Sequence, residues 1–489
     1  MNIVFIMTDT QRQDMVGAYG QPWVDTPHLD RLAAEGIRFD RAYTTCPLCT
    51  PARSGIFTGL HPQVNGAFCN NVAPFAHVPM MGEIFRHHGY RAGYTGKWHL
   101  DGSAYYGDGQ PGGGFEADWW YDGKRYAQEI GHRLFGVYRT AETSAQLRDA
   151  GFTEEKMWGK RVADMAVDFL HDVGDAPYVL GVSFEEPHSP CVAPPEYWEQ
   201  YRPADLPEPA NFHAPLDGKP ALHHVWCGAG DVPDWSACAE SKRRFYGCNR
   251  WIDRQIGRVI EAVDALHADD TVIIYTSDHG DMQHAHGLTG KGPVMYNEIA
   301  RVPFIVRMPT GHGARGAVSR SLVSHIDILP SMLDLAGLTV PPSLHGRSMR
   351  AVLEDPAANC RDTALISFNR FAINHDDFGE FFPIRCLTDG RYKLVINLFD
   401  IDELYDMEAD PHEMSNRIED ASLADVRDAL HDQLLDEMDR IRDPFRSYRW
   451  GDRAWRSVRQ PFFYGGKRRE KPRGFFFEPG SVGYLGSRQ

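Results

Sequence analysis

The stretch Cys49-Thr50-Pro51-Ala52-Arg53 places a thiol beside a predicted helix start. Pro51 favours extended geometry at Thr50 and is pre-set for the first turn of a helix, so Cys49 is expected just ahead of the helix N-terminus. Free backbone N–H groups and the helix dipole favour negative charge there, and Arg53 adds a cation one turn into the helix. This environment suits an activated nucleophile or a bound anion. The alternative is a buried structural thiol.

Cys46 and Cys49 also have Cys-x-x-Cys spacing, which occurs in redox and zinc motifs. The sequence has no second such pair for zinc and no thioredoxin-like pattern around this one, which argues against that interpretation. The nine cysteines are odd in number and scattered. They indicate reduced thiols in a cytoplasm rather than a disulfide framework.

Acidic residues follow two predicted strands. Asp9 comes directly after the apolar run 3–7, and Asp278-His279 follows the run 271–276. Ligands of open α/β sheets bind beyond the carboxyl ends of the strands, so we expect both carboxylates in one crevice. Two carboxylates and an imidazole would titrate abnormally there unless a cation lay between them. With Cys49 they predict a metal site, although each Asp alone would be an ordinary strand-end cap.

Cationic and imidazole side chains fall in similar loops. Gly96-Lys97-Trp98-His99 follows an apolar segment, and His188 follows the predicted strand 178–184. Further groups of this kind lie beyond residue 278: His284, His286 and Lys291. Together they predict a pocket for a tetrahedral oxyanion beside a divalent cation. Taken singly, each lysine would be solvated and each histidine held by ordinary hydrogen bonds.

The elements expected to position these groups alternate over about the first 360 residues. Apolar runs typical of buried strands lie at 3–7, 178–184, 271–276 and 303–306, and helical periodicity lies at 27–35, 242–267 and 324–336. This order predicts an α/β fold with a large, mixed, mostly parallel sheet sandwiched by helices. The irregular, aromatic-rich segments 101–150 and 187–240 are expected to build the substrate pocket.

The pattern changes after residue 360. A hairpin turning at Asp389-Gly390 and an amphipathic helix over about 422–440 predict a small α+β domain with an antiparallel sheet. We therefore divide the chain into a catalytic domain 1–360, a small domain 361–440 and a tail 441–489. Counted from Arg440, the end of the chain has 13 Lys/Arg against 4 Asp/Glu and eleven aromatic residues. Such a tail predicts docking onto the acidic body or an arm that joins subunits of a homo-oligomer.

Composition excludes several classes of function. The 489 residues include 51 Lys+Arg and 67 Asp+Glu, a formal net charge of −16, which argues against a nucleic-acid-binding protein. Hydrophobic residues make up 42%, a value typical of globular proteins. No apolar run reaches about 18 residues, so no membrane span is expected. The start of the sequence lacks the basic region and cleavage site of a signal peptide, which adds to the cytoplasmic expectation.

Several of these motifs, in this order, resemble the type I sulfatases of the alkaline phosphatase superfamily. The matching motifs are Cys49-x-Pro51-Ala52-Arg53 with Thr58-Gly59, Gly96-Lys97-Trp98-His99, Asp278-His279-Gly280, His286-Gly287-x-x-x-Lys291, and Glu403-Leu404-Tyr405-Asp406 with Asp410-Pro411. The resemblance spans about residues 2–420. It implies an alkaline phosphatase-like fold and an enzyme that hydrolyses a sulfuric ester. We expect a sulfated carbohydrate rather than an aryl sulfate as substrate, because several polar and aromatic loops surround the predicted pocket.

The resemblance also implies a modified nucleophile. A formylglycine-generating enzyme would oxidise Cys49 to formylglycine during maturation. A hydroxyl of the hydrated aldehyde would attack sulfur, and sulfate would then leave as the aldehyde is restored. One divalent cation, calcium before manganese or magnesium, would be held by Asp9, Asp278, His279 and the formylglycine oxygen.

The remaining site residues receive their roles from the same resemblance. Arg53 would orient the nucleophile, and Lys97 and Lys291 would bind the sulfate oxygens. His99 and His188 would flank the sulfate, with one of them or Lys291 protonating the leaving oxygen. Two further residues, Asn70 and Asn71, lie shortly after the Cys49 helix and are weaker candidates for substrate contact.

The sequence departs from the common sulfatase pattern beside the metal ligands. Asp9 is followed by Thr10 where many sulfatases have a second Asp, and His279 stands where others have Asn. Formylglycine-dependent phosphonate monoester and phosphodiester hydrolases share this pattern but tend to lack the Gly-Lys-Trp-His segment, so Lys97 and His99 favour sulfate. Such a hydrolase is the first alternative function. A metal-stabilised carbohydrate-binding protein without catalysis is the second.

Overall fold

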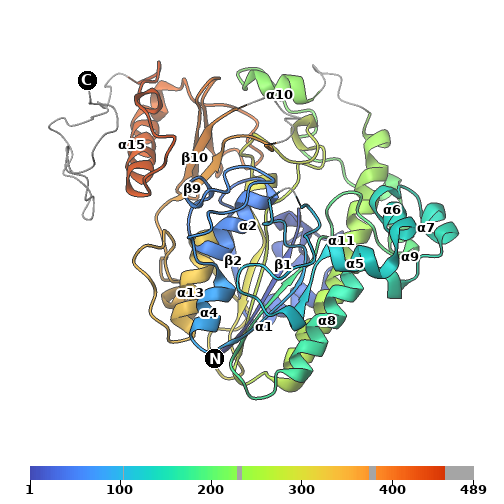
Figure 1. Ribbon diagram of the computed structural model, residues 1–489. Coiled ribbons are helices and arrows are strands. Elements are labelled where there is room, and N and C mark those ends of the chain that lie inside the picture. Colours follow the sequence, from blue (N-terminus) through green and yellow to red (C-terminus); the bar gives the residue numbers. More distant parts are fainter. Residues whose placement is uncertain (103, 228–233, 374–380, 457–489) are drawn as a thin grey trace, which may run out of the picture.

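A computed structural model describes residues 1–102, 104–227, 234–373 and 381–456 of the chain (Figure 1). Its centre is an eight-stranded sheet in the order β4-β3-β5-β1-β6-β7-β2-β8. The strands are β1 (Asn2–Thr8), β2 (Ile37–Tyr43), β3 (Arg91–Gly96), β4 (Trp120–Tyr121), β5 (Tyr178–Ser183), β6 (Thr271–Ser277), β7 (Phe304–Arg307) and β8 (Ala317–Ser324). Only β7 runs antiparallel to its neighbours in this sheet. The predicted mixed, mostly parallel sheet is confirmed.

Helices cover both faces of this sheet, so its strands are buried on both sides. Along β1, Val4 and Ile6 pack into one hydrophobic core, whereas Ile3 and Phe5 pack into the other. The first core is closed by α1 (Pro27–Glu35), α8 (Trp158–Asp172) and α11 (Trp235–Leu266). The second is closed by α2 (Cys49–Thr58), α4 (Met81–His87), α13 (Ile328–Leu335) and α14 (Arg350–Glu354).

The helical predictions hold in position and differ in extent. Helix α1 begins at Pro27 and buries Leu29 and Leu32, as its spacing predicts. Helix α11 begins at Trp235, earlier than the predicted 242, because its first turns already bury Cys238. The remaining helices are α3 (Pro62–Asn65), α5 (Gly123–Ile130), α6 (His132–Thr140), α7 (Ser144–Ala150), α9 (Pro195–Glu199), α10 (Ala221–Trp226), α12 (Asn297–Ala300) and α15 (Ala424–Arg440).

The segment 101–150 is less irregular than expected, since it contains α5, α6 and α7. Two of these helices have capping residues that override the weak periodicity. Asp122 accepts a hydrogen bond from the backbone of Arg125 at the start of α5. Thr143 and Gln146 form a capping box at the start of α7. Local capping therefore begins these helices where the hydrophobic pattern does not indicate them.

A second sheet follows residue 360. It is antiparallel, in the order β12-β11-β10-β9, with β9 (Ala364–Phe368), β10 (Ile384–Thr388), β11 (Tyr392–Asn397) and β12 (Glu403–Asp406). The predicted hairpin at Asp389-Gly390 is confirmed, and Gly390 has the positive φ of 91° that such a turn requires. Helix α15 packs its apolar side chains on this sheet, and both lie together at one end of the molecule (Figure 1).

The described part of the predicted tail, 441–456, packs against the small sheet and α15. Asp443 forms a buried ion pair with Arg385 of β10, and Trp450 is fully buried. Arg453 pairs with Asp402 just before β12. The rest of the tail, 457–489, lies outside the described residues. Within the described part of the chain, no helix combines the length and hydrophobicity needed to cross a membrane.

Candidate active site

Four adjacent parallel strands position most of the candidate residues. Asp9 follows β1 and Asp278 follows β6, and the register that pairs Thr8 with Ser277 sets the two carboxylates side by side. Lys97 follows β3 in the same way, and β5 leads into the loop of His188. The prediction that strand ends bring these residues together is confirmed by their contacts.

Close approach of β3 and β5 requires a glycine before Lys97. Gly96 has φ of 108°, and a Cβ atom there would lie 1.8 Å from the carbonyl oxygen of Ser183. The Lys97 backbone N–H donates to the same carbonyl. The glycine therefore lets the chain turn so that Lys97 enters the site rather than continuing the strand.

Helix α2 begins at Cys49 itself, two residues earlier than the proline suggested. Thr50 is helical, so the expected extended geometry before Pro51 is wrong. Pro51 still lies in the first turn, where its missing N–H has no helical partner to lose. The Asn70 carboxamide accepts the Thr50 N–H at 3.0 Å and the whole helix is buried, which together outweigh the steric preference. Asn70 thus caps the helix that presents Cys49.

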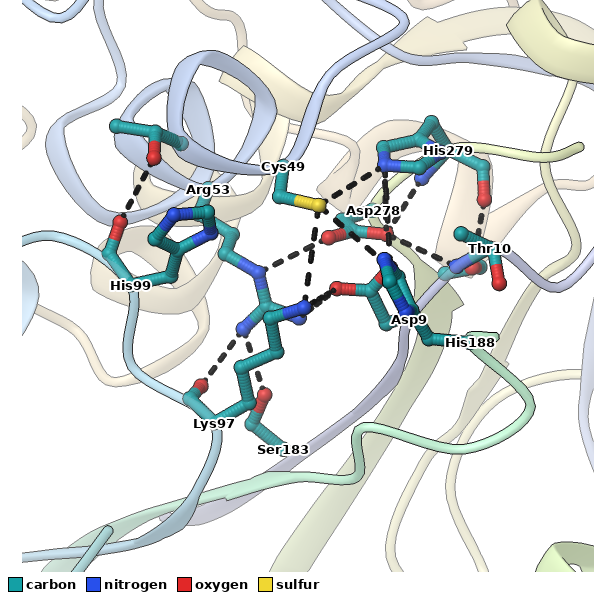
Figure 2. Close-up of polar contacts among 12 residues, drawn as sticks. Asp9, Thr10, Cys49, Arg53, Lys97, His99, Ser183, His188, Asp278 and His279 are labelled. Carbon is teal, nitrogen blue, oxygen red and sulfur yellow. Dashed lines mark hydrogen bonds and ion pairs between the residues drawn. The ribbon is translucent and has the colours of Figure 1, made fainter. Parts of the chain in front are cut away.

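Four side chains converge as a possible metal centre. Ligand atoms of Asp9, Cys49, Asp278 and His279 all lie within 4.8 Å of one another, and all four residues are buried. Figure 2 shows the Cys49 sulfur pointing into this group. It lies 3.6 Å from Asp9 Oδ1 and 3.3 Å from His279 Nε2. These are the four predicted metal ligands.

The donor set fits a divalent cation. The Gly280 carbonyl lies 2.7 Å from His279 Nδ1 and so accepts its hydrogen, which leaves the Nε2 lone pair toward the cluster. Two carboxylates add hard oxygen donors. An oxygen atom at the end of side chain 49 would complete a set suited to calcium, manganese or magnesium better than a thiolate does.

Arg53 joins the two carboxylates. Its Nε donates to Asp278 at 2.9 Å and its Nη2 to Asp9 at 3.0 Å, while Nη1 donates to Ser183 Oγ and to the Lys97 carbonyl. The guanidinium is fully buried, and these four hydrogen bonds fix its plane. In this arrangement Arg53 orients the carboxylates directly and the side chain of Cys49 only through them (Figure 2).

A ring of polar groups closes in front of the Cys49 sulfur. Lys291 Nζ lies 2.7 Å from the sulfur and 3.0 Å from His188 Nε2. The hydroxyl of Tyr105 lies 3.4 Å from His188 Nε2 and 2.5 Å from Lys97 Nζ. Lys97 Nζ in turn lies 3.9 Å from the Cys49 sulfur, which closes the ring. The ammonium groups of Lys291 and Lys97 can donate hydrogen bonds to an oxyanion, so the ring could bind a tetrahedral anion over position 49.

Neighbouring charges shift the pKa values in the site. Burial and Asp9 oppose ionisation of Cys49, yet Lys291, Lys97 and His279 together lower the pKa of the thiol well below its ordinary value. Burial likewise opposes the charge on Asp9, but the two lysines hold its pKa well below the usual range. Burial and Asp9 raise the pKa of Asp278 instead. The site therefore stabilises an anion at position 49.

His99 is held at the edge of the site by the α2 region. Its Nε2 lies 3.1 Å from Asn71 Oδ1, and its carbonyl accepts from the Thr50 hydroxyl. Burial lowers the pKa of His99 to about 4, so its imidazole is neutral near pH 7. The partner of the Asn71 side chain is therefore the imidazole of His99.

Not every candidate from the sequence joins the site. His286 stacks on Tyr296 at 3.7 Å and has a buried, strained backbone with φ of 54°. His284 lies within hydrogen-bonding distance of Ser241. Both follow β6, but the loop turns away before it returns with Lys291. Cys46 is a buried free thiol that forms no disulfide with Cys49.

Sequence reasoning missed Tyr105, Glu185 and Ser183. Ser183 and Glu185 lie at and just beyond the end of β5, so the strand-end argument applied to Asp9 would have found them. Tyr105 comes from the irregular loop after β3, where no periodicity or motif predicts which aromatic ring turns inward.

Comparisons with known proteins agree with this geometry. A model of the sulfatase family matches residues 1–338. A model described as N-sulphoglucosamine sulphohydrolase, C-terminal, matches residues 285–440. The two matches together cover the large sheet, the site residues and the small sheet.

Individual proteins are similar over nearly the whole chain. The uncharacterized sulfatase YidJ of Escherichia coli strain K12 is 43% identical over 467 residues, covering 95% of this chain and 92% of that protein. The N-acetylglucosamine-6-O-sulfatase of Bacteroides thetaiotaomicron is 26% identical, covering 89% and 86%. The solved structure of the phosphonate monoester hydrolase of Agrobacterium radiobacter has a TM-score of 0.74 at 24% identity, covering 90% and 96%, and so shares the fold.

Proposed function

The chain belongs to the sulfatase family, and from that premise we propose that it hydrolyses an organic sulfate monoester with a formylglycine made from Cys49. The proposal rests on one observation above the others. Cys49 begins a buried helix, and its sulfur lies within 4.8 Å of ligand atoms of Asp9, Asp278 and His279 and next to the ammonium of Lys291. Since the chain is a sulfatase, the carbohydrate-binding alternative without catalysis is set aside.

The side chains at the strand ends would hold one divalent cation. Asp9, Asp278, His279 and an oxygen on side chain 49 supply its ligands. When bound, the cation supplies positive charge that stabilises negative charge on the reacting oxygens. We propose calcium first, with manganese or magnesium as the alternatives because one ligand is an imidazole. Elemental analysis of the purified protein identifies the metal.

Conversion of Cys49 by a formylglycine-generating enzyme would give the nucleophile. The hydrated formylglycine supplies a hydroxyl that can attack sulfur, which the thiol cannot replace. The residues around it have separate tasks. Arg53 keeps the two carboxylates in place, while Lys97 and Lys291 bind the sulfate oxygens and neutralise their charge.

The proton for the leaving alcohol is proposed to come from Lys291 or His188. These side chains lie 3.0 Å apart at the open side of the ring. Burial opposes the charge on Lys291, but the anionic groups of Cys49 and Asp9 raise its pKa, so it holds its proton at neutral pH. His99, whose pKa is lowered to about 4, has no proton to spare there and is left with a positioning role.

A sulfated carbohydrate is the proposed substrate. The similarity to an N-acetylglucosamine-6-O-sulfatase over 89% of the chain supports this choice. The phosphonate hydrolase alternative has the same fold, so the fold does not separate the two. Lys97, whose ammonium approaches position 49, favours sulfate over phosphonate.

Steady-state kinetics on matched substrates test the proposal. Purified, natively matured protein is assayed with an aryl sulfate, the corresponding aryl phosphonate monoester and a panel of sulfated mono- and oligosaccharides. We expect sulfate turnover to exceed phosphonate turnover, and one sulfated sugar to exceed the aryl sulfate in kcat/KM. Phosphonate turnover greater by orders of magnitude would reverse the assignment.

Two further proposals concern the cell. All nine cysteines are free, which supports a reducing, cytoplasmic location. The basic end of the chain supports a homo-oligomer in which the tail bridges subunits. Fractionation of native cells and light scattering of the purified protein test these two points separately.

A further inference from the structure

A layer made of Lys97, Tyr105 and Glu185 extends back from the ring that faces Cys49 to a carboxylate that lies outside both the ring and the metal cluster. Glu185 Oε1 lies 3.8 Å from Lys97 Nζ, and both side chains are almost fully buried. Tyr105 lies between them and touches both. Neither Glu185 nor Tyr105 belongs to a motif of the sequence.

The hydrogen bonds of this layer have a defined direction. An ammonium group can only donate, so Lys97 donates to the Tyr105 oxygen at 2.5 Å. The Tyr105 hydroxyl then donates to Glu185 Oε1 at 2.8 Å. The Tyr138 hydroxyl lies 3.4 Å from the other oxygen, Oε2. Glu185 is thus an acceptor at both oxygens, which suits the ionised carboxylate.

Glu185 changes the charge of the site. Arg53, Lys97 and Lys291 contribute three positive charges, and their ion-pair partners are Asp9, Asp278 and Glu185. Among the described residues, Glu185 is the one carboxylate that pairs with these cations and lies outside the candidate metal ligands. The residue beside Asp9 is the neutral Thr10, so the third negative charge comes from the far side of Lys97.

We propose that Glu185, held by Tyr105, determines specificity by making the site prefer a transferred group with one negative charge. A sulfate monoester carries one charge on that group, whereas a phosphate monoester carries two above neutral pH. The inference rests on the proposed function in one respect: the group must bind at the ring over position 49, next to Lys97.

The physical reason is repulsion through a shared cation. Lys97 lies 3.9 Å from the Cys49 sulfur on one side and 3.8 Å from Glu185 on the other. The second charge of a dianion would gain attraction from Lys97 but would also be repelled by the buried carboxylate behind it. At the effective dielectric of a protein site, one added charge at this range changes affinity by roughly tenfold or more.

Two ligands of the same shape that cannot be hydrolysed separate charge from chemistry. Benzenesulfonate carries one negative charge, and phenylphosphonate carries two well above neutral pH. Their Kd values are measured there by calorimetry on the natively matured protein and on three variants. The variants are Glu185→Gln, Tyr105→Phe and, as the matched control, Glu186→Gln. The control carboxyl neighbours Glu185 but accepts from the Gly159 backbone.

The inference predicts a different pattern for each variant. Glu185→Gln should shift the Kd ratio toward phenylphosphonate by roughly tenfold. Tyr105→Phe keeps the charges of Lys97 and Glu185, so the Kd ratio should stay unchanged. It removes the hydroxyl that accepts from Lys97 and positions it, so both ligands should bind more weakly. Glu186→Gln should leave the ratio unchanged as well. An unaltered ratio in Glu185→Gln, or an equal shift in the control, overturns the proposal.

Turnover of an aryl sulfate and the matching aryl phosphate by the same proteins separates the proposed sulfatase function from the proposed role of Glu185. A shifted binding ratio in a protein that hydrolyses no sulfate ester would sink the proposed function and leave the charge selectivity standing. Sulfate ester turnover with an unaltered Kd ratio in Glu185→Gln would overturn the role of Glu185 and leave the proposed function standing. Failure of wild type to bind either ligand would overturn both.

Discussion

Cys49 owes its chemical character to the charges of its neighbours. A thiol in an apolar interior would be hard to ionise, and burial indeed raises the pKa of nearby Cys46 well above its ordinary value. At Cys49 two lysines and His279 reverse that effect. The same field would stabilise an anionic oxygen in its place, so the site is prepared electrostatically before any modification.

Removal of Lys97 should reduce sulfate hydrolysis more than phosphonate hydrolysis. Lys97→Ala deletes the ammonium that approaches position 49 and leaves Arg53 as the remaining cation on Asp9 Oδ2. We expect a fall in kcat/KM for an aryl sulfate of roughly a hundredfold or more, and a smaller fall for an aryl phosphonate. Equal losses on both substrates, measured side by side, would remove Lys97 as the discriminating residue.

Glu186 provides a pH-dependent test of the buried loop after β5. Burial raises its pKa from 4.5 to about 7. The native state therefore holds a proton that the unfolded chain releases, so its contribution to stability is full below about pH 4.5 and is lost as the pH rises through 7.

Glu186→Gln removes this titration and keeps an acceptor for the Gly159 N–H. Relative to wild type, the variant should gain roughly 2–3 kcal/mol of unfolding free energy between about pH 5 and pH 8. Denaturant titrations at both pH values measure the difference. A difference that does not change with pH would show that Glu186 is not buried as a neutral acid.

Sequence motifs identified most of the contacting residues, because strand ends and helix starts place side chains predictably. Asp9, Asp278 and Lys97 converge for that reason. Glu185 lies just beyond the end of β5, where the strand-end argument could have found it. Tyr105 could not be found by the motifs, since its contacts depend on how a long loop folds back across β3 and β5. His286 was misassigned because its motif position does not reveal that the loop turns away before Lys291.

At the scale of elements, the site depends on how closely β3 and β5 approach. The sequence pattern predicts β5 from the apolar run 178–184 and indicates an apolar segment before Gly96, where β3 lies. It does not predict the tight exit at Gly96, where the left-handed backbone and the neighbouring carbonyl leave no room for a side chain. Nor does it predict that α2 begins at Cys49, which depends on the Asn70 carboxamide from another loop.

Gly96→Ala should disrupt this strand exit. The added Cβ would overlap the Ser183 carbonyl, so we expect a loss of about 4 kcal/mol or more in unfolding free energy and the loss of activity. Gly89→Ala is the matched control, because Gly89 also has positive φ but faces open space. It should cost about 1 kcal/mol and keep activity. Similar effects of the two substitutions on thermal unfolding would contradict the account.

A buried ion pair beside the small sheet, contacted by a helix of the large part of the chain, joins the two parts of the molecule. Arg385 of β10 makes two hydrogen bonds to Asp443, and Gln63 of α3 donates to the same carboxylate. Gln63 also accepts from Ser367 of β9. The composition of the tail predicts docking but not these partners, because a buried pair depends on which residues the fold encloses. We propose a domain boundary near residue 360, because the second sheet begins just after it with β9.

Asp443→Ala should therefore destabilise the protein strongly. It leaves the Arg385 guanidinium buried without its carboxylate, which typically costs about 3–5 kcal/mol. Glu199→Ala breaks an ion pair with Arg148 that is exposed, and it should cost less than about 1 kcal/mol. Chemical denaturation of both variants decides the point. Comparable losses would mean that Asp443 does not join the two parts of the chain.

The most direct test measures sulfatase activity against the fraction of position 49 that carries an aldehyde. Protein is produced with increasing amounts of the modifying enzyme, and mass spectrometry of the tryptic peptide gives the aldehyde fraction in each sample. We predict that kcat for a sulfate ester rises in proportion to that fraction and extrapolates to zero for the plain thiol. Full activity in protein that contains only the thiol would contradict the proposed mechanism.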